Sequence, residues 1–276
     1  MAARRNWRIR GLKKSRRARY AAPALEKGLD VLELLATASD ALTHSEMATR
    51  LGRSVPEIFR MLVCLEERGY ISRMGPEDRY QLTLKLFEIV HQYRPLHRLI
   101  TQARPLVQRV ASETGQSCHL AMLNNAEVVV VAQADAPGNM GFSVRPGANI
   151  DLLNTGSGHV ILAFQTDEVR SRALGAWRLR SGKPIPAGLY RHLHQIRRRG
   201  YEELASYQVH GIVNISYPVL NQHDEAIAAM TIPFLARIGD SVGPPEVKQG
   251  LRRATRALSL MTGGKKLELS AGTRQA

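Results

Sequence analysis

Two helix-start signals stand eleven residues apart in the first quarter of this chain, and they restrict its fold more than any other feature. Thr43-His-Ser-Glu46 and Ser54-Val-Pro-Glu57 each place a hydroxyl residue three positions before a glutamate, the spacing of a capping box. Gly52 stops the first helix, and Gly69 stops the second. Two short helices joined by a tight, glycine-containing turn predict a helix-turn-helix.

The segments on either side extend this motif. From Pro23, leucines recur at spacings of three and four (Leu25, Leu29, Leu32 and Leu35), which predicts a preceding helix. Residues 70–73 and 79–82 are expected to form two strands around the turn 75–78. Three helices and a hairpin predict a winged helix-turn-helix. The pattern also allows a helical hairpin and β-ribbon without a DNA role.

The second helix of the pair should enter the major groove with its first turns. Its buried side is predicted to consist of Ile58, Met61, Leu62 and Leu65, and its outer side of Pro56, Arg60, Val63 and Glu67. Arg60 can reach a guanine edge or a phosphate. The alternative for Arg60 is an ion pair with Glu57 or Glu67 on the same helix.

The expected DNA contacts extend to the neighbouring helix start and to the wing. Arg73 and Arg79 suit phosphates or the minor groove, whereas Glu57 would repel phosphates unless it acts as a cap or reads a cytosine amino group. The predicted DNA-binding residues are Thr43, His44, Ser45, Arg53, Ser54, Pro56, Glu57, Arg60, Arg73, Arg79 and Tyr80.

Positive charge is concentrated at the N-terminal end. Of a formal net charge of +15 over 276 residues, residues 1–20 supply nine basic side chains and no acid. A disordered basic arm of this kind binds polyanions, because each neutralised phosphate releases counterions. A transit peptide and a passive solvated tail remain the alternatives.

Other classes of protein fit the sequence poorly. No apolar run reaches the roughly 18 residues of a membrane span, and Cys64 and Cys118 have no disulfide-framework or zinc spacing. His192 and His194 point to different faces of a helix, and the loop 154–159 lacks the lysine of a phosphate-binding loop. We therefore expect no enzyme, cofactor, metal or membrane association, and a cytoplasmic location.

Beyond Gly115 the hydrophobic period changes from 3.6 to 2. Strands are predicted at 117–123, 127–134, 140–144, 211–220 and 225–235, the last two as a hairpin across 221–224. Helices are predicted at 83–93, 96–113 (interrupted by Pro105), 155–164, 186–199 and 245–261. This order indicates an α+β domain with an antiparallel sheet flanked by helices.

Several separated pieces of the chain resemble the IclR family of bacterial transcriptional regulators. They are Arg50-Leu-Gly52 leading to Arg60-Met-Leu62, Leu65 to Tyr70, Gly75 to Leu82, Ala103-Arg-Pro105, Thr114-Gly115 with His119-Leu120, Arg199-Gly-Tyr201, and Gly211 to Val219 with Pro218. The resemblance implies an N-terminal winged helix-turn-helix, a linker helix and a C-terminal GAF-like domain with an antiparallel sheet. The expected boundaries are 1–20 for the arm, 21–82 for the DNA-binding domain, 83–100 for the linker helix, 101–263 for the effector-binding and oligomerisation domain, and 264–276 for the tail.

The resemblance also implies what such a protein does. It would be a ligand-responsive regulator of a catabolic operon that binds double-stranded operator DNA and assembles as a dimer or a dimer of dimers. The implied effector-binding residues are Cys118, His119, Met140, Ile150, Gly156, Ser157, Leu204, Ile212, Asn214, Thr231 and Pro233. The family often places an acid, a cysteine and two serines where this chain has Leu204, Asn214, Thr231 and Pro233.

These four positions therefore carry fewer polar groups than in the family. Their composition favours a larger, partly apolar effector such as an aromatic acid or a lactone, with one polar end fixed and the rest buried. A closed pocket without ligand is the alternative for this site. An architectural DNA-binding protein, whose C-terminal domain only oligomerises, is the alternative for the whole chain.

Overall fold

The computed structural model describes residues 22–139, 141–238 and 242–264, which divide into two compact units with a boundary between His97 and Arg98. The predicted arm, Met140 and nearly all of the predicted tail lie outside the described residues. Among the described residues, every helix is too short or too polar to cross a lipid bilayer.

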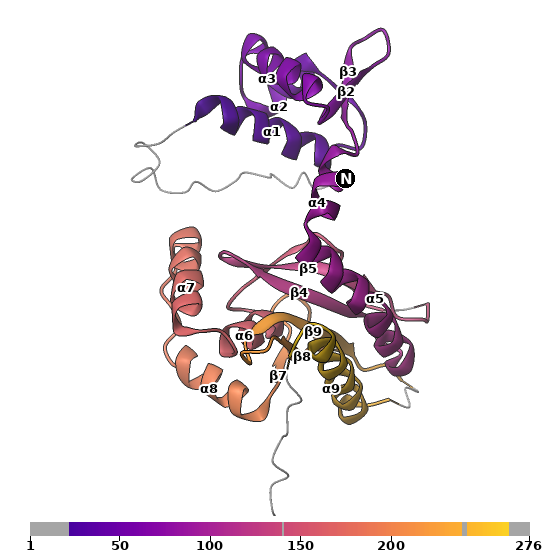
Figure 1. The fold of residues 1–276 in the computed structure, drawn as a ribbon, viewed down its shortest axis with the longest axis vertical. Helices are drawn as coiled ribbons and strands as arrows, with labels where there is room; N and C mark the ends of the chain where they lie inside the picture. The colour runs from indigo at the N-terminus through magenta and orange to yellow at the C-terminus, as the bar shows by residue number, and fades with distance from the viewer. Residues whose placement is uncertain (1–21, 140, 239–241, 265–276) are drawn as a thin grey trace, which may run out of the picture. The chain divides into compact units, whose positions relative to one another are not determined.

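The first unit is a winged helix-turn-helix, as predicted (Figure 1). Its elements are α1 (Pro23–Thr37), β1 (Leu42–Thr43), α2 (His44–Leu51), α3 (Val55–Glu67), β2 (Ile71–Met74), β3 (Arg79–Leu82) and α4 (Lys85–Gln92). The three strands form an antiparallel sheet in the order β1-β3-β2. Both predicted capping boxes are present, at the starts of α2 and α3.

The core of this unit lies between the three helices and the wing. Val31 and Leu35 of α1 pack with Met47, Ile58 and Leu62, all of them buried. Leu25 and Leu29, which contributed to the leucine spacing that predicted this helix, lie outside the core and are 63% and 48% exposed.

The second unit is the expected antiparallel sheet with flanking helices. Its elements are α5 (Arg94–Thr114, which begins before the boundary), β4 (Cys118–Asn124), β5 (Glu127–Ala134), β6 (Asn149–Asp151), α6 (Gly156–Ala163), α7 (Asp167–Ser181), α8 (Leu189–Arg199), β7 (Glu202–Ala205), β8 (Ile212–Leu220), β9 (Ala226–Leu235) and α9 (Pro244–Met261). The six strands run in the order β6-β5-β4-β9-β8-β7. The hairpin of β8 and β9 is confirmed.

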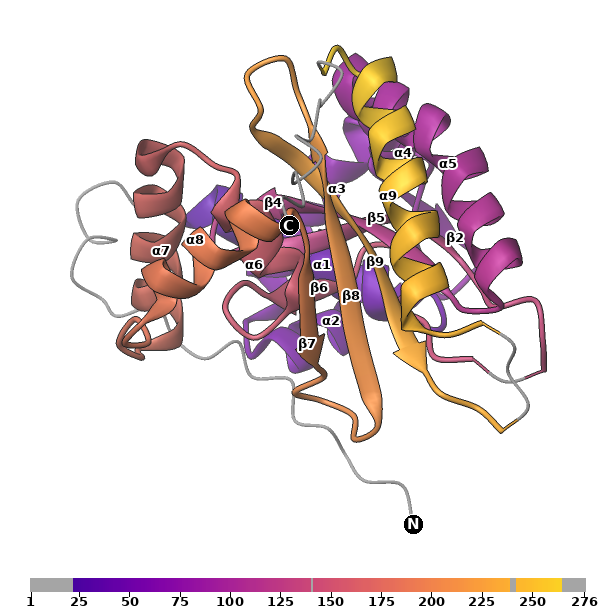
Figure 2. The ribbon, with the colours of Figure 1, turned by 90° about the horizontal axis from the view of Figure 1, so that it is seen from below.

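Each face of this sheet has its own core. Residues of α5 and α9 pack on one face with Leu120, Ile215 and Ile232, and residues of α6, α7 and α8 pack on the other with Ala121 and Ala229. Figure 2 shows α5 and α9 side by side on one side of the sheet and α6, α7 and α8 on the other. Antiparallel strands buried on both faces fit the nearly continuous apolar runs of β8 and β9.

The structure of this unit differs from the predicted elements at five points. Residues 141–144 form no strand, and the partner of β5 is instead β6, after the turn at Pro146-Gly147. The elements α7 and β7 were not predicted, because α7 has charged residues around most of its surface and β7 is only four residues long. Pro105 lies inside an uninterrupted α5, whose buried side (Ala103, Leu106 and Val107) stays packed across it.

Candidate DNA-binding surface and effector pocket

The outer side of α3 carries one long cation among apolar groups. Arg60 is exposed and has neither a hydrogen bond nor an ion pair with any residue that the structure describes, so the alternative of a pairing with Glu57 or Glu67 is not realised there. Val55, Phe59 and Val63, spaced four residues apart, are 39%, 49% and 39% exposed. Such a surface can donate to a guanine and contact thymine methyl groups.

Phe59 was not among the predicted site residues. Phe59 directly follows the buried Ile58, so it resembles part of the core in the sequence. The helical spacing that places Val63 on the outer side nevertheless places Phe59 on that side as well. A helical wheel drawn over positions 55, 59 and 63 would have found it.

The carboxylate of Glu57 is held by Ser54, at the start of its own helix, and by Lys27 of α1. Its carboxylate accepts hydrogen bonds from the Ser54 backbone N–H (3.1 Å) and hydroxyl (2.9 Å), and it pairs with the Lys27 ammonium of α1 (2.6 Å). Lys27 and Ser54 together lower the pKa of Glu57 to about 2. The negative charge at the start of α3 is therefore compensated within the domain, which removes the conflict with phosphates.

The remaining predicted residues around the turn have mainly structural contacts. Thr43 caps α2 by accepting from the Glu46 N–H, and Arg53 pairs with Asp30 of α1 at 2.7 Å. His44 and Ser45 open α2, with Ser45 exposed and His44 half-buried. Ser45 is thus accessible to a partner without rearrangement, whereas Arg53 would have to leave Asp30.

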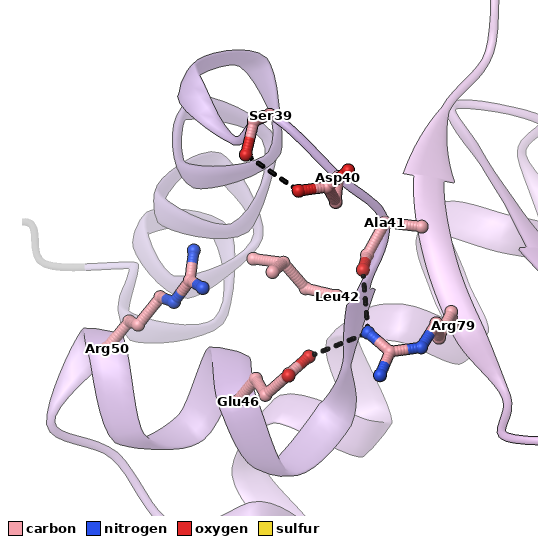
Figure 3. Close-up of a pocket in the computed structure, with 7 residues that line it drawn as sticks. All are labelled: Ser39, Asp40, Ala41, Leu42, Glu46, Arg50 and Arg79. Atoms are coloured by element: carbon pink, nitrogen blue, oxygen red, sulfur yellow. Dashed lines mark hydrogen bonds and ion pairs between the residues drawn. The ribbon is translucent and has the colours of Figure 1, made fainter.

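The wing arginines are held by acids of the same domain. Arg73 lies 3.7 Å from Glu66 and 3.6 Å from Asp78. Arg79 donates to the Ala41 carbonyl (3.1 Å) and to Glu46 (3.3 Å) at the edge of a cavity of about 420 Å³ that Arg50 also lines (Figure 3). Arg79 thus ties the wing to the start of α2, and its side chain remains 40% exposed.

Tyr80 corrects the predicted set. Its side chain is only 2% exposed and belongs to the core of the domain, where β3 pairs with β2 and β1. Burial raises the pKa of its hydroxyl. Arg79 is only partly buried, and its neighbour Tyr80 on the same short strand points to the opposite face, into the core.

In the second unit, polar side chains form a row across four strands. The strand registers pair His119 of β4 with Thr231 of β9, Thr231 with Ser216 of β8, and Ser216 with Glu202 of β7. Directly opposed residues in antiparallel strands point to the same face, and this face is the one that α6 covers. We call these four residues the polar row.

The start of α6 lies directly on the polar row. The Ser157 hydroxyl is 2.8 Å from the Thr231 hydroxyl, which in turn donates to the Ser216 hydroxyl at 2.8 Å. A Cβ atom on Gly156 would lie 2.6 Å from the Ser216 hydroxyl oxygen, so only glycine fits this approach. The sheet and the first turn of α6 therefore form one closely packed polar layer.

A cavity of about 30 Å³ lies at the His119 end of the row. It is lined by His119, Phe142, Val144, Ile150, Thr155, Gly156, Ser157, Ser206, Tyr207, Gln208, Asn214 and Thr231. Small-molecule sites usually enclose about 300–1,000 Å³, so this cavity is nearly closed. Six of the predicted effector residues line it: His119, Ile150, Gly156, Ser157, Asn214 and Thr231.

His119 stands out within this lining. Its Nε2 atom is buried and has no hydrogen-bond partner, and burial lowers the pKa of the ring to about 4. The imidazole is therefore neutral at pH 7, with one polar atom available to a molecule that enters the cavity. A buried polar atom left unpaired costs free energy that such a molecule can recover.

The other predicted effector residues lie elsewhere. Cys118 points to the opposite face of the sheet, into the core beneath α5 and α9, which corrects its assignment. Leu204, Ile212 and Pro233 share the face of the polar row but are not part of the cavity lining. Tyr207 and Gln208, in the loop after β7, were missed because a polar loop carries no periodic signal.

Comparisons with known proteins agree with this architecture. Residues 24–75 match the model of the IclR helix-turn-helix domain, and residues 91–260 match that of the bacterial transcriptional regulator IclR C-terminal domain. The chain is 29% identical over 213 residues to the HTH-type transcriptional regulator BhcR of Paracoccus denitrificans, covering 76% of each chain. It is also 29% identical over 194 residues to KdgR of Escherichia coli, covering 69% of this chain and 74% of that protein.

Solved structures share the fold. The IclR homolog of Microbacterium hydrocarbonoxydans in complex with 4-hydroxybenzoate superposes with a TM-score of 0.71 at 22% identity, over 87% of this chain and 98% of that one. The Thermotoga maritima IclR structure gives a TM-score of 0.65 at 24% identity, over the same shares of the two chains.

Proposed function

The chain belongs to the IclR family of bacterial transcriptional regulators, and on this premise we propose that it regulates a catabolic operon by binding operator DNA through α3 and sensing a small organic effector beneath α6. The family consists of DNA-binding regulators with a helix-turn-helix, not of enzymes. The observation that carries the DNA-binding part is the outer side of α3, where Arg60 is exposed and the charge of Glu57 is compensated.

Arg60 is the proposed base-reading residue. In a bidentate contact with guanine, its loss should weaken operator binding by on the order of 1–3 kcal/mol. Arg60→Ala should show this loss in an electrophoretic or fluorescence-anisotropy titration. Arg68→Ala is the matched control, because Arg68 is also exposed but follows the last residue of α3. Equal operator affinity of Arg60→Ala and wild type would remove Arg60 from the DNA contact.

The effector is proposed to enter the cavity next to His119. His119, Thr231 and Ser157 would hold one polar end, and Phe142, Val144 and Ile150 would contact an apolar body. This combination favours an aromatic or partly apolar acid, and a homologous structure contains 4-hydroxybenzoate. Because the cavity holds only about 30 Å³, its lining must open to admit such a molecule, and we propose that the loop with Tyr207 and Gln208 moves.

A ligand panel tests the effector class. Thermal-shift measurements with aromatic acids, lactones, pyruvate and glyoxylate at equal concentration should favour the aromatic or partly apolar compounds. Asn214→Leu should abolish the response and leave DNA binding of the free protein intact, since Asn214 lines the cavity in the second unit and α3 belongs to the first. Preference for pyruvate or glyoxylate would contradict this class.

The small cavity also favours a second function, an architectural DNA-binding protein whose C-terminal domain only oligomerises. The two functions differ in one measurement. An effector should change operator affinity in a regulator, whereas no ligand should change it in an architectural protein.

Self-association is proposed to use α4. None of its eight residues is buried, although Leu86, Phe87, Ile89 and Val90 are apolar and 37–58% exposed. An apolar helix surface of this size is typical of an interface. Phe87→Glu should therefore shift the protein toward monomer in light scattering, and an unchanged mass would exclude α4 as the interface.

A further inference from the structure

Three potential metal ligands meet at the Glu202 end of the polar row. His159 of α6, His192 of α8 and Glu202 of β7 each offer one ligand atom, and these atoms lie within 4.8 Å of one another. Glu202 is fully buried, His159 is nearly so, and the His192 side chain is 35% exposed. The cluster joins three elements that are separate in sequence and shares no residue with the lining of the effector cavity.

The hydrogen bonds of His159 define its protonation pattern. Its Nε2 atom lies 2.9 Å from the Leu153 carbonyl oxygen, which can only accept, so Nε2 carries a hydrogen and donates it. In the neutral ring, Nδ1 is then a lone pair. It lies 3.3 Å from Glu202 Oε2, which is also an acceptor. Two acceptors that face one another in a buried place require a positive species between them, either a proton or a metal ion.

The two oxygens of Glu202 have separate partners. Oε1 accepts from the Arg199 guanidinium and from the Glu203 backbone N–H (2.8 Å). Oε2 is left to the two imidazoles, His159 Nδ1 and His192 Nε2. Outer hydrogen bonds of this kind orient the ligands of metal sites, where a histidine typically donates its other N–H to a carbonyl or carboxylate.

The geometry suits a single small cation. The His159 and His192 rings are nearly perpendicular, at 76°, with centroids 5.0 Å apart, so that both nitrogens can approach one point. Zinc takes imidazole nitrogen and carboxylate oxygen at about 2.0–2.2 Å in a tetrahedral arrangement. The 3.3 Å between His159 Nδ1 and Glu202 Oε2 matches two such ligands, and the partly exposed His192 can shift outward to admit the ion.

We propose that His159, His192 and Glu202 form a binding site for a divalent transition-metal ion of the zinc type, with a water molecule as fourth ligand. The bound ion would tie the edge strand β7 and helix α8 to α6, whose first turn lines the effector cavity. This site does not depend on the proposed DNA target or effector.

The test compares two histidines on the same helix. Metal-free full-length protein is titrated with Zn²⁺ and followed by calorimetry and thermal shift, and with Co²⁺ followed by visible absorption. His192→Ala removes a ligand at a partly exposed position, and His194→Ala removes an exposed histidine two residues away that is outside the cluster. Wild type and His194→Ala should bind one Zn²⁺ per chain, gain thermal stability and give the absorption bands of tetrahedral Co²⁺.

His192→Ala should bind Zn²⁺ at least about 100-fold more weakly, because even the loss of an outer hydrogen-bond partner costs 10–100-fold in affinity. The same Zn²⁺ response in His192→Ala as in wild type would overturn the proposal. So would the absence of any Zn²⁺-dependent stabilisation of wild type, which would mean that a proton alone bridges His159 and Glu202.

Discussion

The outer side of α3 and the polar row beneath α6 are both candidate functional surfaces, but they are built in opposite ways. On α3, thirteen consecutive residues supply Arg60, Phe59 and Val63, which face outward. The polar row takes single residues from four strands that span more than a hundred positions of the chain. The first is a property of one helix, whereas the second exists only when the strand registers are correct.

This difference predicts how each surface responds to a substitution. A substitution on α3 should weaken one contact and leave the fold intact. A substitution in the polar layer should affect stability, because buried polar groups depend on all their partners.

The largest effect is expected at Gly158. A Cβ atom there would collide with the Leu152 carbonyl oxygen, a backbone atom that cannot turn away. Gly158→Ala should therefore cost on the order of 3 kcal/mol or more of unfolding free energy. Chemical denaturation, followed through the unfolding transition of the second unit, measures this loss of free energy. If Gly158→Ala were as stable as wild type, the loop before α6 would be loosely packed. The polar layer would then tolerate substitutions as the outer side of α3 does.

The second prediction concerns the pH dependence of stability through His119. The folded protein holds the pKa of this ring near 4, below its ordinary value, so the unfolded chain takes up the proton first as the pH falls. Between about pH 6.5 and 4, the unfolding free energy should drop by up to about 3 kcal/mol from this group. Among the residues that the structure describes, no charged side chain lines the cavity with His119, and Tyr207 is the one other titratable group in the lining.

His119→Gln should make the stability curve of the protein flatter over this range than that of wild type. Denaturant titrations at several pH values compare the two proteins. If the unfolding free energies of the two proteins changed with pH in parallel, His119 would be accessible to water in the folded protein, and this end of the polar row would not be buried.

The third prediction concerns the basic arm, which lies outside the described residues. If four of its nine cations meet phosphates, deletion of residues 2–20 should lower the slope of log affinity against log salt by about 3.6. The loss should be similar for operator and for unrelated DNA, whereas Arg60→Ala should affect the operator more. An unchanged slope would make the arm a passive tail.

The smallest effect is expected at Gly175, in the middle of α7, where an added Cβ meets nothing within 4 Å. Gly175→Ala should raise the unfolding free energy by about 1 kcal/mol, because alanine restricts the unfolded chain and favours helix. Gly175→Ala is the matched control for Gly158→Ala. A loss of stability in Gly175→Ala would show that another part of the protein contacts the surface of α7.

The sequence by itself determined the parts of this protein that depend on near neighbours. The two capping boxes, the glycine between them and the hairpin specified a winged helix-turn-helix, because caps, turns and helical faces involve residues three to five positions apart. The same reasoning placed Arg60 outside and Ile58 and Leu62 inside. The change of the hydrophobic period after Gly115 predicted the sheet domain, and the family resemblance added six residues of its cavity lining.

Only the tertiary structure decided where charges and polar atoms find partners. The pairing of Glu57 with Lys27, the inward turn of Tyr80 and the opposite face of Cys118 follow from how elements pack or how strands pair. The sequence suggested no metal site, since His192 and His194 diverge on their helix; His159 and Glu202 join His192 only after α6, α8 and β7 meet. Contacts between residues far apart in the chain depend on strand register and helix packing, and no local pattern encodes these.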